Sequence, residues 1–154
     1  MTRLLLASAA LAAAALAALA PAASATRLPG IVSPSGNIRC LFVPPSNGSG
    51  PVNLLCSIGA AVYTTHLQDR CMAPDGSGVD WHGFELGAIR PGQVLCTGGI
   101  LYNPGTQHPH YVTLPYSRTW HQNVFTCTSR VTGLTCTNRA GHGVFISRES
   151  WRTW

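Results

Sequence analysis

Residues 124–148 read VFTCTSRVTGLTCTNRAGHGVFISR, and this stretch decides the fold class. Two short runs of β-branched and aromatic residues each carry a cysteine, Cys127 in the first and Cys136 in the second. The polar residues 129–133 between them end in glycine, which is the composition of a hairpin turn. Alternation of apolar and small residues resumes over 141–146 and predicts a third strand. We therefore expect an antiparallel unit closed by a short disulfide.

Residues 1–25 have the pattern of a secretory signal peptide. A positive start at Arg3 precedes an apolar run over 4–20 that only Ser8 interrupts, and Ala23-Ser24-Ala25 supplies small residues for cleavage. A membrane anchor is the alternative, but this alanine-rich run is short and weakly apolar for a membrane span. We expect residues 26–154 to form a single secreted β domain, periplasmic or extracellular, without a membrane span and monomeric by default.

The six cysteines all follow the expected cleavage site. An even number of cysteines in an exported chain favours three disulfides over metal binding or thiol chemistry, and no C-x-x-C motif occurs. The cysteines allow about fifteen pairings, and we expect the sequential one. It joins Cys40 to Cys56, Cys71 to Cys96, and Cys127 to Cys136.

The rest of the chain is a series of short strand patterns separated by glycine and proline. Their spacing of about 8–12 residues predicts an all-β fold, a small antiparallel sandwich or barrel. Gly98-Gly99 is typical of a two-residue hairpin. Ser147 is a residue type that favours a helix N-cap, so we expect a short C-terminal helix to begin there. The spacing of Trp151 and Trp154 would place both on one face of that helix. The expected strands cover residues 37–43, 52–58, 60–67, 79–86, 93–97, 100–102, 110–114 and 123–128, besides those above.

The charge of the final third is basic. The chain contains no lysine, and residues 118–152 carry five arginines against Glu149 alone. These residues predict a basic, aromatic face that binds phosphate, sulfate or acidic glycans of the cell envelope. The plainer interpretation, which we prefer, is a solvated positive side with buried tryptophans. Export and modest charge argue against nucleic acid. The candidate ligand-binding residues are Trp120, Arg130, Arg139, His142, Arg148 and Trp151.

Two segments resemble motifs of a known family. Residues 33–40, SPSGNIRC, and residues 133–148, GLTCTNRAGHGVFISR, are similar to the SPSGNI-x-C opening and the G-x-x-C-x-N and GHGF-like closing of a bacterial family of small exported proteins of unknown function. Leu114-Pro115-Tyr116 also fits, although family members tend to have glycine at the position of Ser117. The resemblance implies export, disulfides and a single domain, and it implies no activity.

Three groups of residues offer reactive chemistry. His142 lies between two glycines and could act as a contact or general base, but a structural hydrogen-bonding role is the stronger interpretation. Asp80 and His82 would share a strand face, so that the carboxylate could tune the imidazole. His108 and His110 could bind zinc only with a third ligand, such as His121 or His142. We expect no cofactor and no metal.

We therefore expect a non-enzymatic binding or interaction module whose partner is an anionic envelope glycan or another secreted protein. One alternative is a secreted inhibitor of a hydrolase that presents a rigid loop over 44–51 or 103–110. The other alternative is a hydrolase that uses His142 or the Asp80–His82 pair, although the chain has no G-x-S-x-G motif to supply a nucleophile.

Overall fold

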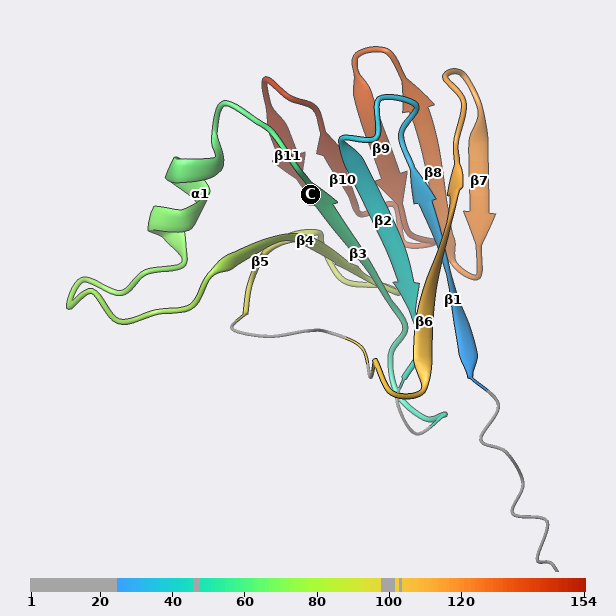
Figure 1. Cartoon of the computed structure of the whole chain (residues 1–154), viewed down its shortest axis with the longest axis horizontal. Helices are drawn as coiled ribbons and strands as arrows, with labels where there is room; N and C mark the ends of the chain where they lie inside the picture. The colour runs from blue at the N-terminus through green and yellow to red at the C-terminus, as the bar shows by residue number, and fades with distance from the viewer. Residues whose placement is uncertain (1–24, 46–47, 98–101, 103) are drawn as a thin grey trace, which may run out of the picture.

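The computed structural model describes residues 25–45, 48–97, 102 and 104–154. Within them the chain forms two β-sheets packed face to face, with one short helix at the side (Figure 1). Residues 1–24 of the expected signal peptide, the turn at Gly98-Gly99 and residues 100–101 of the strand expected over 100–102 lie outside the described residues. None of the helices in the described part is both long and apolar enough to cross a membrane.

The larger sheet has six strands in the order β5-β4-β3-β2-β1-β6. All neighbours are antiparallel except β1 and β6, which run parallel and begin and end at the same ends of the sheet. Its strands are β1 (Thr26–Val32), β2 (Ile38–Val43), β3 (Asn53–Ile58), β4 (Trp81–Gly87), β5 (Gln93–Cys96) and β6 (Gln107–Thr113).

The smaller sheet has five antiparallel strands in the order β11-β10-β9-β8-β7. Its strands are β7 (Thr119–Gln122), β8 (Phe125–Arg130), β9 (Gly133–Thr137), β10 (Gly143–Ile146) and β11 (Trp151–Thr153). Residues 124–148 supply β8, β9 and β10, so the prediction of three consecutive strands in this stretch is confirmed. Because the two sheets keep separate edges, the fold is a sandwich and not a closed barrel.

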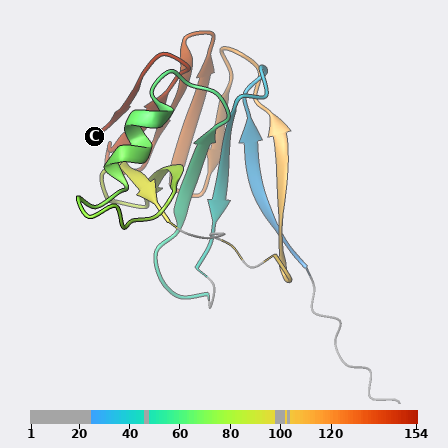
Figure 2. The same cartoon turned by 60° about the vertical axis from the view of Figure 1, so that its left-hand side comes forward.

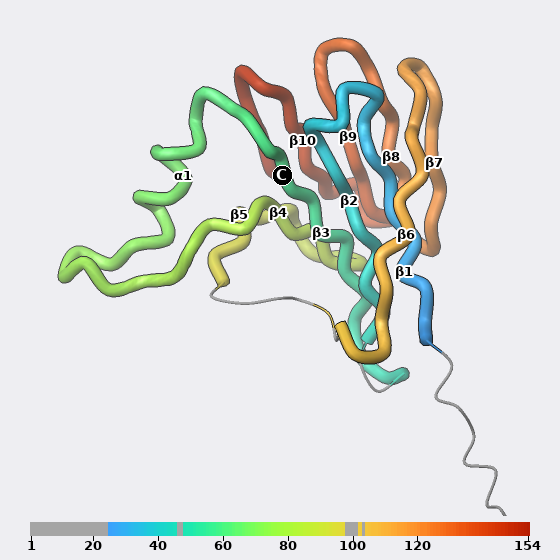
Figure 3. Tube along the Cα trace, in the orientation of Figure 1, coloured from blue at the N-terminus to red at the C-terminus, as the bar shows by residue number. Residues whose placement is uncertain are grey.

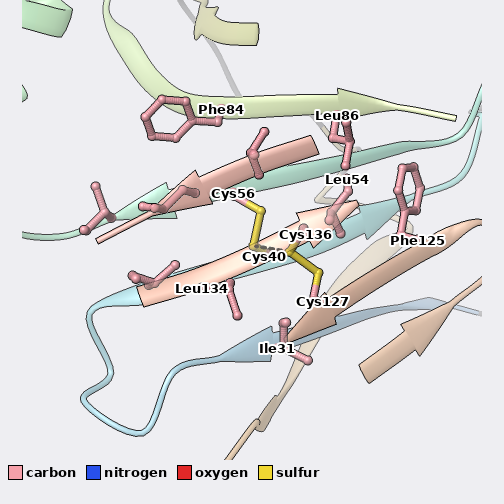
Figure 4. Close-up of a cluster of buried hydrophobic side chains, with 14 of the residues drawn as sticks. Ile31, Cys40, Leu54, Cys56, Phe84, Leu86, Phe125, Cys127, Leu134 and Cys136 are labelled. Atoms are coloured by element: carbon pink, nitrogen blue, oxygen red, sulfur yellow. Dashed lines mark hydrogen bonds between the residues drawn. A yellow bond between two sulfur atoms is a disulfide. The ribbon is translucent and has the colours of Figure 1, made fainter. Parts of the chain in front are cut away.

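The core lies between the sheets and contains two of the three disulfides (Figure 4). Cys40 stands directly opposite Cys56 in the larger sheet, and Cys127 opposite Cys136 in the smaller one, with 4.0 Å between the Cα atoms of each pair. The third disulfide joins Cys71, at the end of the helix, to Cys96 in β5. The sequential pairing is therefore confirmed.

Residues 60–67 were expected to form a strand, and this prediction is wrong. The chain turns after Ile58 and forms the helix α1 (Thr64–Arg70), which buries Leu67. Its two threonines favour a strand by propensity, but the burial of Leu67 and Tyr63 against the sandwich outweighs that small preference. The helix and the segment after it project to one side of the sheets (Figures 1 and 2).

The predicted C-terminal helix is also wrong, because the chain ends in strand β11. The hydroxyl of Ser147 does accept hydrogen bonds from the N–H groups of Glu149 and Ser150, as a helix cap would. It closes the turn of a hairpin instead, since residues 151–153 pair with β10. The indole of Trp154 packs on Gly143 and donates a hydrogen bond to the carbonyl of Gly141. The two glycines around His142 thus allow a left-handed turn at Gly141 and close approach of this ring at Gly143.

Replacing Ser117 with glycine is expected to stabilise the protein by about 1 kcal/mol. Ser117 has φ +64° in a turn closed by the hydrogen bond from the N–H of Arg118 to the carbonyl of Pro115. A side chain in this left-handed region costs about 1–2 kcal/mol, which glycine avoids, although the unfolded chain gains entropy. Urea unfolding measures the difference. An unchanged or lower midpoint for Ser117→Gly would contradict the strain at this position.

Candidate functional site

A polar cleft of about 350 Å³ opens at one end of the sandwich, between the loops that connect its strands. The connections β1–β2, β6–β7, β8–β9 and β10–β11 all gather at this end, at the top of the trace in Figure 3. We call it the end cleft. Its lining comprises Ser33, Ser35, Asn37, Ile38, Ala60, Tyr116, Ser129, Arg130, Val131, Thr132, Gly133, Leu134, Ser147, Arg148 and Glu149.

The bottom of the end cleft is the upper edge of the hydrophobic core. Ile38 and Leu134 are buried there, together with two serines, Ser33 from the β1–β2 connection and Ser129 from β8. Ser129 is 1% exposed and belongs to the lining of the cleft. In the part of the chain that the structure describes, every side-chain polar atom sealed off from solvent has a hydrogen-bond partner.

Two arginines stand at the exposed rim of the end cleft. The guanidinium of Arg130 makes no ion pair within the described residues. Arg148 contacts Glu149 at 3.9 Å, with both side chains more than 70% exposed, and such a pair is weak. The two guanidiniums against one carboxylate leave the rim with a net positive charge. Tyr116, 42% exposed, adds an aromatic ring.

The walls of the end cleft are held by side-chain hydrogen bonds to the backbone. The Asn37 amide donates to the carbonyl of Ala60 at 2.9 Å and accepts from the N–H of Ala60 at 2.8 Å. The Ser33 hydroxyl accepts from the N–H of Ile38 at 3.0 Å. These bonds fix the β1–β2 loop and the start of the segment leading to α1, so the cleft is formed before a ligand arrives.

The loop between β10 and β11 is held by Tyr63. Its hydroxyl donates to the carbonyl of Ser147 at 2.7 Å, and the neighbouring N–H of Val62 donates to the carbonyl of Arg148 at 3.0 Å. Burial, with a smaller contribution from the negative charge of Glu149, raises the pKa of Tyr63 to about 12. Tyr63 therefore carries a neutral phenol in the folded protein at pH values where a free tyrosine ionises.

This pKa predicts a loss of stability at alkaline pH. Between pH 10 and 12 the unfolded chain loses the phenol proton while the folded protein keeps it, so the free energy of unfolding falls as pH rises. Tyr63→Phe is expected to flatten this fall and to cost about 1 kcal/mol at neutral pH through the lost hydrogen bond. Urea unfolding at pH 8 and pH 11 measures both effects. Tyr116→Phe, at an exposed position, is the control, and an equally steep fall for Tyr63→Phe would contradict the assignment.

The structure brings two of the six predicted ligand-binding residues together. Arg130 and Arg148 both line the end cleft. Arg139 and His142 lie in the β9–β10 connection, at the opposite end of the sandwich. Trp120 and Trp151 are half-buried and pack against the core, and the ring of Trp151 lies 5.4 Å from that of Phe84 and under the guanidinium of Arg70. The six residues do not form one face.

The other candidates also lie outside the end cleft. His82 Nδ1 lies 3.2 Å from the backbone carbonyl oxygen of Asp80. This contact of the imidazole is with the backbone of Asp80 and not with its carboxylate. His108 and His110 lie in edge strand β6. The loop expected over 103–110 is therefore wrong from Gln107 onward, because this part of the chain pairs with β1. Among the described residues no third ligand joins these histidines, because the one group of three metal-binding side chains there consists of cysteines.

Sequence reasoning missed the residues that complete the end cleft. The hydroxyls of Ser33, Ser35 and Ser129 and the phenol of Tyr116 were not identified as binding groups. Three of these four residues lie in the segments that carry the family resemblance, and so do Asn37 and Arg148. Those segments were the available signal, but only the fold shows that they meet at one end of the molecule.

The fold and the cleft define a class of protein: a disulfide-stapled β-sandwich that presents a preformed polar site between its loops. No curated protein and no solved structure shows significant similarity to the chain. Residues 9–152 match a family of unknown function (DUF6636). The chain belongs to this family.

Proposed function

We propose that the protein is a non-enzymatic binding module outside the cytoplasm and that the end cleft recognises an anionic group, such as the carboxylate or sulfate of an acidic glycan. The observation that carries this proposal is that two exposed arginines, Arg130 and Arg148, line the same cleft as four serines, Ser33, Ser35, Ser129 and Ser147. Guanidinium groups and hydroxyls are the donors that bind carboxylate, sulfate and phosphate oxygens. Three disulfides support a location outside the cytoplasm.

The chemistry of the lining favours binding over catalysis. Glu149 is its one carboxylate, and its described residues include no histidine, lysine or thiol. A hydrolase needs a nucleophile or an activated water beside a general base, and the lining does not place two such groups together. Tyr116, and not Trp120 or Trp151, is the aromatic ring positioned to stack on a sugar.

The proposal predicts that Arg130→Ala and Arg148→Ala each weaken binding of an acidic glycan by about 10- to 100-fold, since hydrogen bonds to charged groups contribute about 1.5–3 kcal/mol each. Calorimetric titration with polygalacturonate and dextran sulfate measures the affinity, which should also fall as salt is added. Arg139→Ala, at the opposite end of the sandwich, is the matched control. Equal losses for Arg139→Ala, or equal binding of uncharged dextran, would refute the proposal.

One observation supports the alternative function, a secreted inhibitor of a hydrolase. It concerns a segment other than the two loops expected for that function, 44–51 and 103–110. Residues 72–80 are exposed and project from the sheets beyond α1. The segment is anchored by the Cys71–Cys96 disulfide and stiffened by Asp75, whose carboxylate accepts hydrogen bonds from the N–H and hydroxyl of Ser77. Hydrogen bonding to Ser77 also lowers the pKa of Asp75. Inhibition of purified lysozyme or a serine protease that is lost on Met72→Ala and Asp75→Ala would favour this function over the first.

A further inference from the structure

The smaller sheet, formed by β7–β11, has one face that points away from the larger sheet (Figure 1). Val144 and Ile146 of β10 are buried in the core, so the side chain of Phe145 between them lies on the opposite face. We call this opposite face the outer face. The strand register places five threonines on it beside Phe145: Thr119, Thr126, Thr128, Thr135 and Thr137.

Two aromatic rings rest on the backbone of the outer face, at positions where glycine leaves room for them. A Cβ atom at Gly133 would lie 2.8 Å from Cε2 of Phe145, and one at Gly143 would lie 2.5 Å from Cζ2 of Trp154. The indole of Trp154 is also fixed by its hydrogen bond to the carbonyl of Gly141. Both aromatic residues are half-buried, so part of each ring is open to a ligand.

The two rings lie along a path that begins at the end cleft. Gly133, on which Phe145 rests, is one of the residues that line this cleft. In β9, Gly133 is four positions from Thr137, and Thr137 pairs with Gly143. At about 3.4 Å per residue, the two glycines are therefore about 14 Å apart along the strands. A chain leaving the end cleft along β10 would cross Phe145 first and Trp154 next.

The charge of the outer face is positive. Arg152 pairs with Phe145 across β10 and β11, and its guanidinium lies 5.0 Å from the centre of the Trp154 ring. Arg130 pairs with Gly133 and belongs to the same face. Strands β7–β11 contain no aspartate or glutamate. The two guanidiniums therefore complement an anionic ligand at either side of the Phe145 ring.

The threonines of the outer face match the hydroxyls of a sugar. The hydroxyl oxygens of Thr119 and Thr128 lie 3.2 Å apart, and that of Thr126 lies 3.1 Å from Nδ1 of His121. A hydroxyl can donate one hydrogen bond and accept two, so each of these groups keeps capacity for a ligand. Aromatic rings, hydroxyls and guanidiniums on one face are the groups that an acidic sugar chain requires.

We propose that the outer face of the smaller sheet is a second subsite for the glycan of the end cleft, so that the ligand is an acidic polysaccharide chain and not a single terminal sugar. This inference rests on the proposed function of the end cleft. The apolar C–H side of one sugar unit packs on Phe145, and that of a later unit packs on Trp154. Carboxylate or sulfate groups of the chain pair with Arg130 and Arg152.

The test compares a short and a long chain of the same acidic sugar. Calorimetric titration with digalacturonate and hexagalacturonate measures the two affinities. We expect the hexamer to bind at least about 10-fold more tightly, because the dimer fills only the end cleft. Phe145→Ala and Trp154→Ala should each weaken the hexamer about 10-fold, as expected for the loss of an aromatic anchor, and leave the dimer unchanged. Arg148→Ala should weaken both lengths.

Further variants separate loss of contact from loss of folding. Arg152→Gln, at an exposed position, should weaken the hexamer about 10-fold without disturbing the fold. Trp154→Phe keeps a planar ring and should retain most of the affinity. Tyr111→Ala is the matched control, because Tyr111 is also a partly exposed strand residue resting on a glycine, Gly30, but belongs to the larger sheet. Urea midpoints report the stability of each variant.

The outcomes distinguish the outer face from the end cleft. Equal affinity for the two lengths, unchanged hexamer binding in Arg152→Gln and Phe145→Ala, or an equal loss in Tyr111→Ala would overturn the second subsite. In each of these cases the end cleft keeps its proposed function, provided that Arg148→Ala still weakens the dimer. If neither length binds to the wild-type protein, both proposals are overturned.

Discussion

Replacing Cys40 and Cys56 together with alanine is expected to lower the free energy of unfolding by about 4–5 kcal/mol. Opening a loop with a sequence separation of 16 restores chain entropy to the unfolded state, worth about 3 kcal/mol. The two sulfurs are also fully packed in the core, and deleting them leaves a void that adds about 1–2 kcal/mol. Domains of this kind are typically stable by about 5–15 kcal/mol, so the variant should be marginal at 37 °C.

The disulfide between Cys71 and Cys96 is the control for this prediction. Its loop is longer, with a sequence separation of 25, so chain entropy alone ranks it as the more stabilising of the two. It lies outside the core, however, with Cys96 exposed, and the segment around α1 can open while the sheets stay folded. We expect its removal to cost less than about 2 kcal/mol. Urea unfolding followed by tryptophan fluorescence orders the two variants, and the reverse order would show that loop length outweighs packing.

Asn138→Asp is expected to destabilise the protein by about 3 kcal/mol or more at neutral pH. The amide nitrogen of buried Asn138 donates to the carbonyls of Gly87 and Arg90, at 2.8 and 2.9 Å, and its oxygen accepts from the N–H groups of Ala140 and His142. The substitution keeps the size of the side chain but places a carboxylate oxygen against two carbonyl oxygens. A buried charge facing like dipoles costs several kcal/mol.

The pH dependence of this variant separates charge from shape. Burial and the two carbonyls favour the protonated acid, so the pKa of the new carboxyl is raised in the folded state. The variant is therefore least destabilised at low pH and loses stability as pH rises through that folded pKa. Asn123→Asp, at an exposed turn, is the control. If Asn138→Asp were equally destabilised from pH 4 to pH 8, lost shape and not charge would explain the effect.

Local patterns predicted most of the sandwich correctly. The strands within residues 124–148 could be predicted from local alternation, because each of them pairs with the next strand along the chain through a hairpin. The cysteine pairing followed for the same reason, since Cys40–Cys56 and Cys127–Cys136 each close a hairpin. The predictions failed where a segment's surroundings outweighed its own preference. Residues 64–70 contain two threonines yet form a helix, and Trp151 completes a sheet edge because β10 offers it a partner.

The candidate site was predicted only in part. The arginine-rich final third correctly indicated Arg130 and Arg148, which line the end cleft. It also indicated Arg139, which lies in the β9–β10 connection at the opposite end of the sandwich. Ser33 and Ser129 are 96 residues apart in the sequence. Ser33 directly follows strand β1 of the larger sheet, whereas Ser129 lies in β8 of the smaller sheet. No spacing rule relates such positions, because the packing of one sheet on the other determines which strand ends meet.

The sequence by itself determined the β class, the sequential disulfides and the turn residues, since each depends on neighbours within one hairpin or one short loop. Only the tertiary structure decided which loops share an end of the sandwich, which arginines face the same cleft, and that two disulfides touch across the core. These features depend on how the two sheets are stacked, and that arrangement is set by burial of the whole apolar surface and not by any single stretch of the chain.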